Sequence, residues 1–197
     1  MSEQLLLPGI EPELQNTARL FLAVLPDAEA AKRIRNFTQS LRSQHALRNR
    51  PIIDGRLHLS LFPCGDFPGI PEHFISAVDI VAKRVALPEF TLELDRVMSF
   101  GQFETRGAKP CVLRAARGNA ELIDLNQQLW KAFTDTGRKI SLDKWFTPHL
   151  TLLYSTRMIP EYPIDPIVWR VREFVLVHSA IGRGEPYDVL ARWPLAA

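Results

Sequence analysis

One short pattern occurs twice in the chain, as Leu57-His58-Leu59-Ser60-Leu61 and as Pro148-His149-Leu150-Thr151-Leu152. Each copy contains a histidine, an apolar residue, a hydroxyl residue and a leucine. Side chains alternate between the two faces of a strand, so the histidine and the hydroxyl would share one face and the leucines the other. A helix would separate the imidazole from the hydroxyl by roughly 200°. The pattern therefore predicts two strands, each presenting a His-x-Ser/Thr pair.

A strand and a helix are expected before the first histidine segment. Residues 19–25 form a continuous apolar run that ends at Pro26, which is typical of a buried strand. Asp27 is a favourable N-cap residue, and apolar side chains then recur at helical spacing up to about Ser43. The first half of the chain therefore opens with a strand, a helix and a histidine strand.

The remaining sequence alternates strand patterns, helix patterns and turn signals. We expect a loop at 62–66, a helix at 71–85, strands at 90–97 and 111–115 around a turn or hairpin loop at 101–110, a helix at 119–136, a turn at 160–166, a strand at 168–177, and a hairpin at 182–186 leading into 187–193. Antiparallel connections with interspersed helices favour an α+β fold over a doubly wound parallel sheet. Two similar units, each presenting one histidine strand, would then face each other across a central cleft about a pseudo-twofold axis.

Composition restricts the class of protein. The 197 residues suit one domain or two small lobes; we expect residues 1–17 to be a tail and residues 18–197 a single bilobal domain. The net charge of +2 permits an anionic substrate without requiring one. Cys64 and Cys111 form no CxxC pair, so the sequence predicts neither a disulfide framework nor a zinc site and suits a reducing cytosol. No stretch approaches the roughly 20 apolar residues of a membrane span, and we expect a cytoplasmic monomer with no membrane partner.

Basic residues are concentrated between the first strand and the first histidine, where Asp54 is the only carboxylate after Glu29. One interpretation is an electrostatic approach path for a polyanion. The other is an ordinary solvated helix face and loop. The residues concerned are Lys32, Arg33, Arg35, Arg42, Arg48, Arg50 and Arg56.

Two histidines and two hydroxyls suit the hydrolysis of a phosphodiester. One proton must leave the attacking water and another must reach the departing oxygen, and histidine can perform either transfer near neutral pH. His58 and His149 are therefore the candidate acid and base, and which one is the base stays open. Ser60 and Thr151 would donate to the non-bridging oxygens, where charge builds up in the transition state.

Other chemistries fit the two segments less well. A metal centre would need three or four ligands, and neither segment offers a second one at the usual spacing. A serine hydrolase would need an elbow such as GxSxG, which the sequence lacks. A half-buried strand with satisfied polar residues remains the structural alternative. We therefore expect catalysis without a metal.

The sequence resembles the 2H phosphoesterase superfamily, and specifically its LigT-like group of 2′-5′ RNA ligases and RNA 2′,3′-cyclic phosphodiesterases. The resemblance is carried by residues 19–23, by both histidine segments, by Phe146-Thr147 before the second one, and by the closing hairpin with Gly184 and Tyr187. It implies a bilobal fold with the two motifs facing across a cleft. It also implies cofactor-free opening of a 2′,3′-cyclic phosphate to a 2′-phosphate, and some members join RNA ends through a 2′-5′ bond.

The same resemblance implies substrate-binding residues. Phe146 would line the base-binding part of the cleft, where aromatic stacking tolerates any base, and core packing is the alternative. Trp145 and Phe62 are weaker candidates of the same kind.

The sequence departs from the family pattern at several positions. Ser60 stands where threonine is commoner, and Lys144-Trp145 stand where arginine is often found. Many members carry a basic residue at the position of Tyr154, which an unbroken strand would turn away from His149. Arg157 is a candidate substitute for that contact. We expect an enzyme acting on RNA or nucleotides with a cyclic phosphate or a 2′-5′ linkage; the alternative is a nucleotide- or RNA-binding module of the same fold without turnover.

Overall fold

The computed structural model describes residues 15–101, 107–137 and 146–197 of the chain. Within these ranges the helices are α1 (Ala28–Gln44), α2 (Glu72–Ala82) and α3 (Ala120–Thr134), with a single 3-10 turn, η1 (Asp54–Arg56). The strands are β1 (Ala18–Val24), β2 (Leu59–Phe67), β3 (Phe90–Ser99), β4 (Lys109–Arg114), β5 (Leu150–Ser155), β6 (Tyr162–Val171), β7 (Glu173–Ala180) and β8 (Asp188–Pro194).

These strands form one sheet in the order β6-β3-β4-β5-β2-β1-β7-β8, and neighbouring strands are antiparallel throughout. The sheet divides at its centre, because β2 and β5 pair at one position, Leu59 with Leu150. One half, here the first lobe, contains β2, β1, β7 and β8, and the second lobe contains β5, β4, β3 and β6. The predicted α+β fold with two antiparallel lobes is therefore confirmed.

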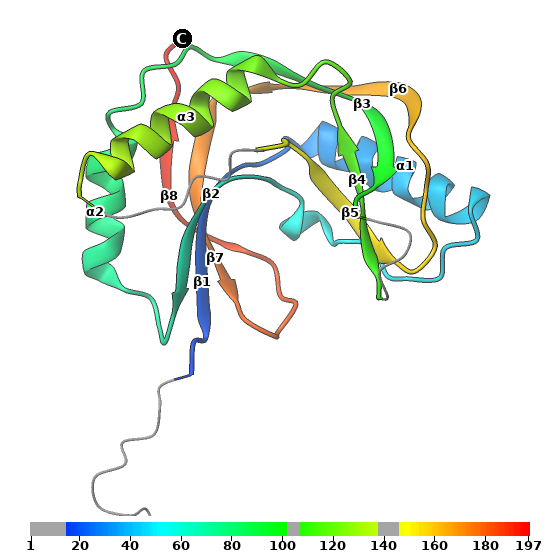
Figure 1. Cartoon of the computed structure of the whole chain (residues 1–197), viewed down its shortest axis with the longest axis horizontal. Coiled ribbons are helices and arrows are strands. Elements are labelled where there is room, and N and C mark those ends of the chain that lie inside the picture. Colours follow the sequence, from blue (N-terminus) through cyan, green and yellow to red (C-terminus); the bar gives the residue numbers. More distant parts are fainter. Residues whose placement is uncertain (1–14, 102–106, 138–145) are drawn as a thin grey trace, which may run out of the picture.

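The two lobes repeat one unit of strand, helix and histidine strand, as β1-α1-β2 and β4-α3-β5. Each helix packs on the lobe opposite to the one its own strands belong to, α1 against β6 and α3 against β2 (Figure 1). A guanidinium nitrogen of Arg33 on α1 donates to the Pro166 carbonyl on β6 at 2.6 Å. Phe133 on α3 stacks on Phe62 of β2, with ring centroids 4.4 Å apart. Because each of these helices packs on the opposite lobe, they hold the two lobes together.

The helices begin where the sequence predicts. Asp27 caps α1, and its carboxylate accepts the Ala30 backbone N–H at 2.8 Å. Ala30, Ile34 and Leu41 are fully buried at helical spacing and face the main core between helices and sheet. Helix α3 ends three residues before Gly137, whose φ of 80° suits glycine.

The prediction of a loop at residues 62–66 is wrong, because β2 continues to Phe67. Pro63 cannot donate to a ladder, and Gly65 has a φ of 128°. Both are tolerated because β2 pairs with β5 only at Leu59, which leaves this part of β2 with β1 as its sole partner among the described strands. Register shifts in the β1 pairing accommodate the irregularity.

The predictions of a turn at 160–166 and of a single strand at 168–177 are also wrong. Strand β6 begins at Tyr162 and pairs with β3 at the outer edge of the second lobe, where its two prolines face no further described strand. After Arg172 the chain leaves this edge and β7 pairs with β1 in the first lobe. The alternating pattern at 168–177 does not show that its first residues belong to a strand of the second lobe and its last residues to a strand of the first. None of the described helices has the length and apolar character needed to cross a membrane.

Candidate active site

A cleft of about 860 Å³ lies where the two lobes meet, and both predicted histidines line it. His58 and His149 each precede the first residue of their strand, β2 and β5. Leu59 and Leu150, the next residues, are fully buried and pair with each other. The two histidines therefore lie on either side of the single position that joins the lobes.

Both imidazoles are held in the same way. Nδ1 of His58 contacts the Arg56 carbonyl at 2.9 Å, and Nδ1 of His149 contacts the Thr147 carbonyl at 2.8 Å. A carbonyl oxygen can only accept, so the proton of each neutral ring is on Nδ1. Nε2 is then left without a proton and is available as a base. For His58, this nitrogen lies 3.0 Å from Ser60 Oγ, which donates to it.

The two rings differ in their surroundings. His58 packs against Phe21 and Tyr187, with ring centroids 5.0 and 5.2 Å away. Burial lowers the pKa of His58; the hydrogen bond to the Arg56 carbonyl opposes this, and the nearby charges of His149 and Arg56 lower the pKa further. His149 contacts the ring of Phe100 at 4.8 Å. These surroundings therefore favour the neutral form of His58.

The two hydroxyl residues are placed unequally. Ser60 is exposed and lines the cleft beside His58. Thr151 is half-buried, and it is not among the residues that line the cleft. Its strand partner is Val112 of β4. The structure thus brings one of the two predicted hydroxyls to the cavity surface together with both histidines.

Tyr154 lines the cleft although an unbroken strand would turn it away. The pairing of β4 with β5 shifts by one residue, so that Leu152 and Leu153 are both buried. This bulge places Tyr154, which is 51% exposed, on the same cavity as His149.

Of the remaining predicted residues, Phe146 and Phe62 line the cleft and Arg157 does not. Phe146 is half-buried and also packs on the main core. Arg157 donates from its guanidinium to the His45 carbonyl at 2.6 Å. Trp145 and Lys144 lie outside the described residues.

Sequence reasoning missed several residues of the cleft. Arg56 reaches it two residues before His58, and its guanidinium lies 4.6 Å from the centre of the Tyr187 ring. Arg19 and Asp66 form a two-bonded ion pair at 2.7 and 2.8 Å on the cavity wall. The basic window contained Arg56 and the closing hairpin contained Tyr187, but only the packing of η1 against the β7–β8 connection brings them to the histidine.

Possible metal ligands and thiols also occur within the described part of the chain. Its histidine, cysteine, aspartate and glutamate side chains form no group of three able to hold a metal ion. Neither cysteine forms a disulfide within the described residues, and burial raises the pKa of Cys111 to about 11, which makes it a poor nucleophile.

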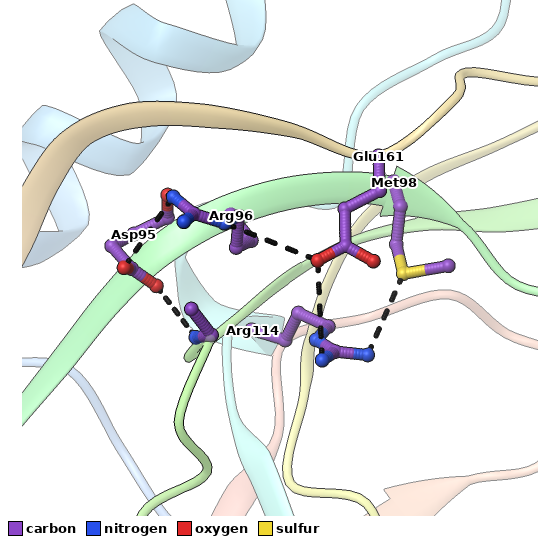
Figure 2. A network of polar contacts seen from close by, with 6 residues as sticks. Asp95, Arg96, Met98, Arg114 and Glu161 are labelled. Atoms are coloured by element: carbon purple, nitrogen blue, oxygen red, sulfur yellow. Dashed lines mark hydrogen bonds and ion pairs between the residues drawn. The ribbon is translucent and has the colours of Figure 1, made fainter.

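The sheet face of the second lobe carries a polar network of its own. Figure 2 shows Arg96 and Arg114, which are strand partners, directed at one carboxylate oxygen of Glu161 at 4.0 and 3.9 Å. Asp95 lies 3.5 Å from Arg96 and accepts the Ala116 backbone N–H at 2.7 Å. Two arginines thus face two carboxylates, so these four side chains carry no surplus positive charge.

Comparison with known proteins agrees with this arrangement. The family model described as the 2′-5′ RNA ligase superfamily matches residues 26–182. The structure of E. coli LigT complexed with NADP+ is 28% identical, has a TM-score of 0.69, and matches over 93% of this chain and 100% of that one. The complex of the same protein with 3′-AMP gives the same identity and coverage and a TM-score of 0.68.

A third structure, that of TT0787 from Thermus thermophilus, is 24% identical with a TM-score of 0.66 over 90% of this chain and 97% of that one, and shows likeness of fold. The search of curated proteins gave no match. The family match spans both histidine segments and both lobes, and on this basis the chain belongs to the 2′-5′ RNA ligase superfamily of 2H phosphoesterases.

Proposed function

We propose that the protein hydrolyses 2′,3′-cyclic phosphates of RNA ends or nucleotides to 2′-phosphates without a metal. The observation that carries the proposal is the matched pair of imidazoles. His58 and His149 line one cleft, and each is held through Nδ1 by its own backbone so that Nε2 is the nitrogen left to exchange a proton. Two such groups can remove one proton and supply another in a single displacement.

The proposed roles follow from the surroundings of the two rings. His58, whose pKa is lowered by burial, accepts a proton from water as the water oxygen attacks phosphorus. The bond from phosphorus to the 3′ oxygen breaks, and His149 donates the proton that this oxygen needs; in this role His149 starts the step as an imidazolium, with a proton on Nε2 as well as on Nδ1. When His58 Nε2 becomes protonated, the Ser60 hydroxyl that donated to it is released and can donate to a non-bridging phosphate oxygen.

The other predicted residues enter the proposal with different support. Phe146 and Tyr154 are proposed to contact the base or sugar, since both line the cleft. Thr151 keeps its proposed role as a donor to phosphate because it lies two residues after His149 on an extended segment. Arg157 is not included, because its guanidinium donates to a backbone carbonyl.

Nucleotides as ligands are supported by the relatives. E. coli LigT has been crystallised with 3′-AMP, with ATP and with NADP+. These complexes also favour the alternative proposal, a nucleotide- or RNA-binding module without turnover. A further activity proposed for the same cleft is the joining of two RNA ends through a 2′-5′ bond. Two cysteines that form no disulfide within the described residues agree with a reducing compartment such as the cytosol, where we propose the protein acts.

Turnover of a defined substrate tests the proposal. The protein is given an oligonucleotide ending in a 2′,3′-cyclic phosphate, with EDTA present, and we expect a 2′-phosphate product. His58→Ala and His149→Ala should each reduce kcat by about 10²- to 10⁴-fold. His73→Ala is the control, since His73 is exposed on α2 and lies outside the cleft.

Two outcomes would contradict the proposal in different ways. Binding of the oligonucleotide without any product favours the binding module. Turnover that stops with EDTA and returns with zinc or magnesium contradicts the metal-free mechanism.

A further inference from the structure

A second cavity of about 540 Å³ opens beside the cleft and shares Arg19, Arg56 and Ser179 with it. Its other walls are residues 50–53, which precede η1, together with Ala180 at the end of β7 and Ile181, Gly182 and Gly184 after it. The shared residues place the two cavities next to each other. A ligand held by the histidines could therefore extend from the first cavity into the second.

The walls of this second cavity are joined to each other and to the sheet. The Tyr187 backbone N–H donates to the Gly55 carbonyl at 2.9 Å, and the Ile52 N–H donates to the Leu152 carbonyl at 2.7 Å. Gly55 also packs closely on Pro186, because a Cβ at this glycine would lie 2.9 Å from the proline Cβ. The cavity is thus a built feature of the fold.

Its lining is positively charged. Arg19, Arg50 and Arg56 line it, and no aspartate or glutamate of the described residues does. Arg19 is paired with Asp66, and the side-chain hydrogen bonds of Arg56 to other described residues are long, to the Glu185 carbonyl at 3.2 Å and the Tyr187 hydroxyl at 3.4 Å.

Arg50 is exposed, and no carboxylate of the described chain lies within ion-pair distance of it. This differs from the network of Figure 2, where two carboxylates balance two arginines. The second cavity therefore attracts an anion.

The same cavity exposes apolar side chains. Ile53 is 45% exposed and Ile181 is 38% exposed, and both line it with Ile52. Gly182 and Gly184 have open space where a side chain would otherwise project. Positive charge next to apolar surface suits a phosphate that is attached to a sugar and a base.

We infer that this cavity binds the 5′-phosphate of the terminal nucleotide together with the nucleotide before it. The inference rests on the proposed function and names its substrate class, an RNA strand in preference to a free cyclic nucleotide. Arg56 connects the two sites, because its carbonyl holds His58 while its side chain lines both cavities.

Three substrates that differ by one group at a time test the inference. They are adenosine 2′,3′-cyclic phosphate, the same compound with a 5′-phosphate, and an adenosine dinucleotide ending in the cyclic phosphate. Arg50→Gln should lower kcat/KM about fivefold to tenfold for the two substrates that carry the extra phosphate, since it removes one charged contact. Hydrolysis of the first substrate should be unchanged.

Two further variants sharpen the test. Arg48→Gln is the matched control, because Arg48 is also exposed and basic, two residues away, and does not line the cavity. Ile181→Ser should lower kcat/KM for the dinucleotide alone, which distinguishes a bound nucleotide from a bound phosphate. For the dinucleotide, the slope of log kcat/KM against log salt should become shallower by about one unit in Arg50→Gln.

The failure of this inference differs from that of the proposed function. Equal effects of Arg50→Gln on all three substrates, or no effect on any, would overturn the second site while leaving the chemistry intact. If the wild-type protein hydrolyses none of the three, the proposed function fails. Equilibrium binding of the dinucleotide to the wild type and to Arg50→Gln then decides the inference, and equal affinities overturn it.

Discussion

At the scale of single residues, the site depends on how two imidazoles are held. His58 and His149 donate from Nδ1 to carbonyls two residues earlier, and this local geometry requires no distant partner. What separates the two rings is packing, since His58 lies against Phe21 and Tyr187. Their chemical difference is therefore set by long-range contacts that a short motif does not contain.

Tyr187→Ala should move the acidic limb of the pH profile. His58 acts as a base only when neutral, so its lowered pKa places the limb of kcat/KM below the ordinary histidine value of about 6.5. Removing the tyrosine ring admits water to His58, which raises its pKa and shifts the limb to higher pH. Tyr187→Phe keeps the ring and should keep the limb in place. An unmoved limb in Tyr187→Ala would contradict the assignment of His58 as base.

At the scale of elements, most of the structure could be predicted from periodicity. The cap at Asp27 and the buried spacing of α1 are local signals, and they gave the right helix. The continuation of β2 through Pro63 could not be predicted. A strand accepts a proline there because β5 pairs with β2 only at Leu59, and the sequence does not show this pairing. The bulge at Leu152, which brings Tyr154 to the cleft, arises likewise from pairing with β4.

Phe133→Ala should reduce the free energy of unfolding by about 3 to 5 kcal/mol, because it leaves a cavity where α3 packs on the opposite lobe. Phe133 is 3% exposed and stacks on Phe62, which lines the cleft. Urea denaturation measures the loss, and Phe133→Leu should cost less, since it fills part of the space. A loss below about 1 kcal/mol would show that α3 contributes little to joining the lobes.

At the scale of the whole molecule, the helix of each repeated unit covers strands of the other lobe. Helix α1 covers β6 of the second lobe, and α3 covers β2 of the first (Figure 1). The family resemblance implied two lobes that face each other, and the structure has them. The crossing of the helices between lobes could not be predicted, because either helix would bury the same apolar stripe on either lobe.

A chain divided at Gly69, which is exposed between β2 and α2, should therefore fold only when both pieces are present. Residues 1–69 would leave β1 and β2 uncovered, and residues 70–197 would leave β6 without α1. We expect the co-expressed pieces to purify together and to recover turnover. Cooperative unfolding of either piece alone, followed by circular dichroism, would contradict this view.

The hydrogen bond from Nδ1 of each histidine to a backbone carbonyl has a consequence for the direction of the reaction. By microscopic reversibility, the group that accepts a proton in one direction donates it in the other. Both rings are held through Nδ1 by a backbone carbonyl, so in each of them Nε2 is the nitrogen that gains or loses the transferred proton. With the proposed roles, hydrolysis and 2′-5′ joining would then differ only in the attacking oxygen, that of water or that of a second RNA end.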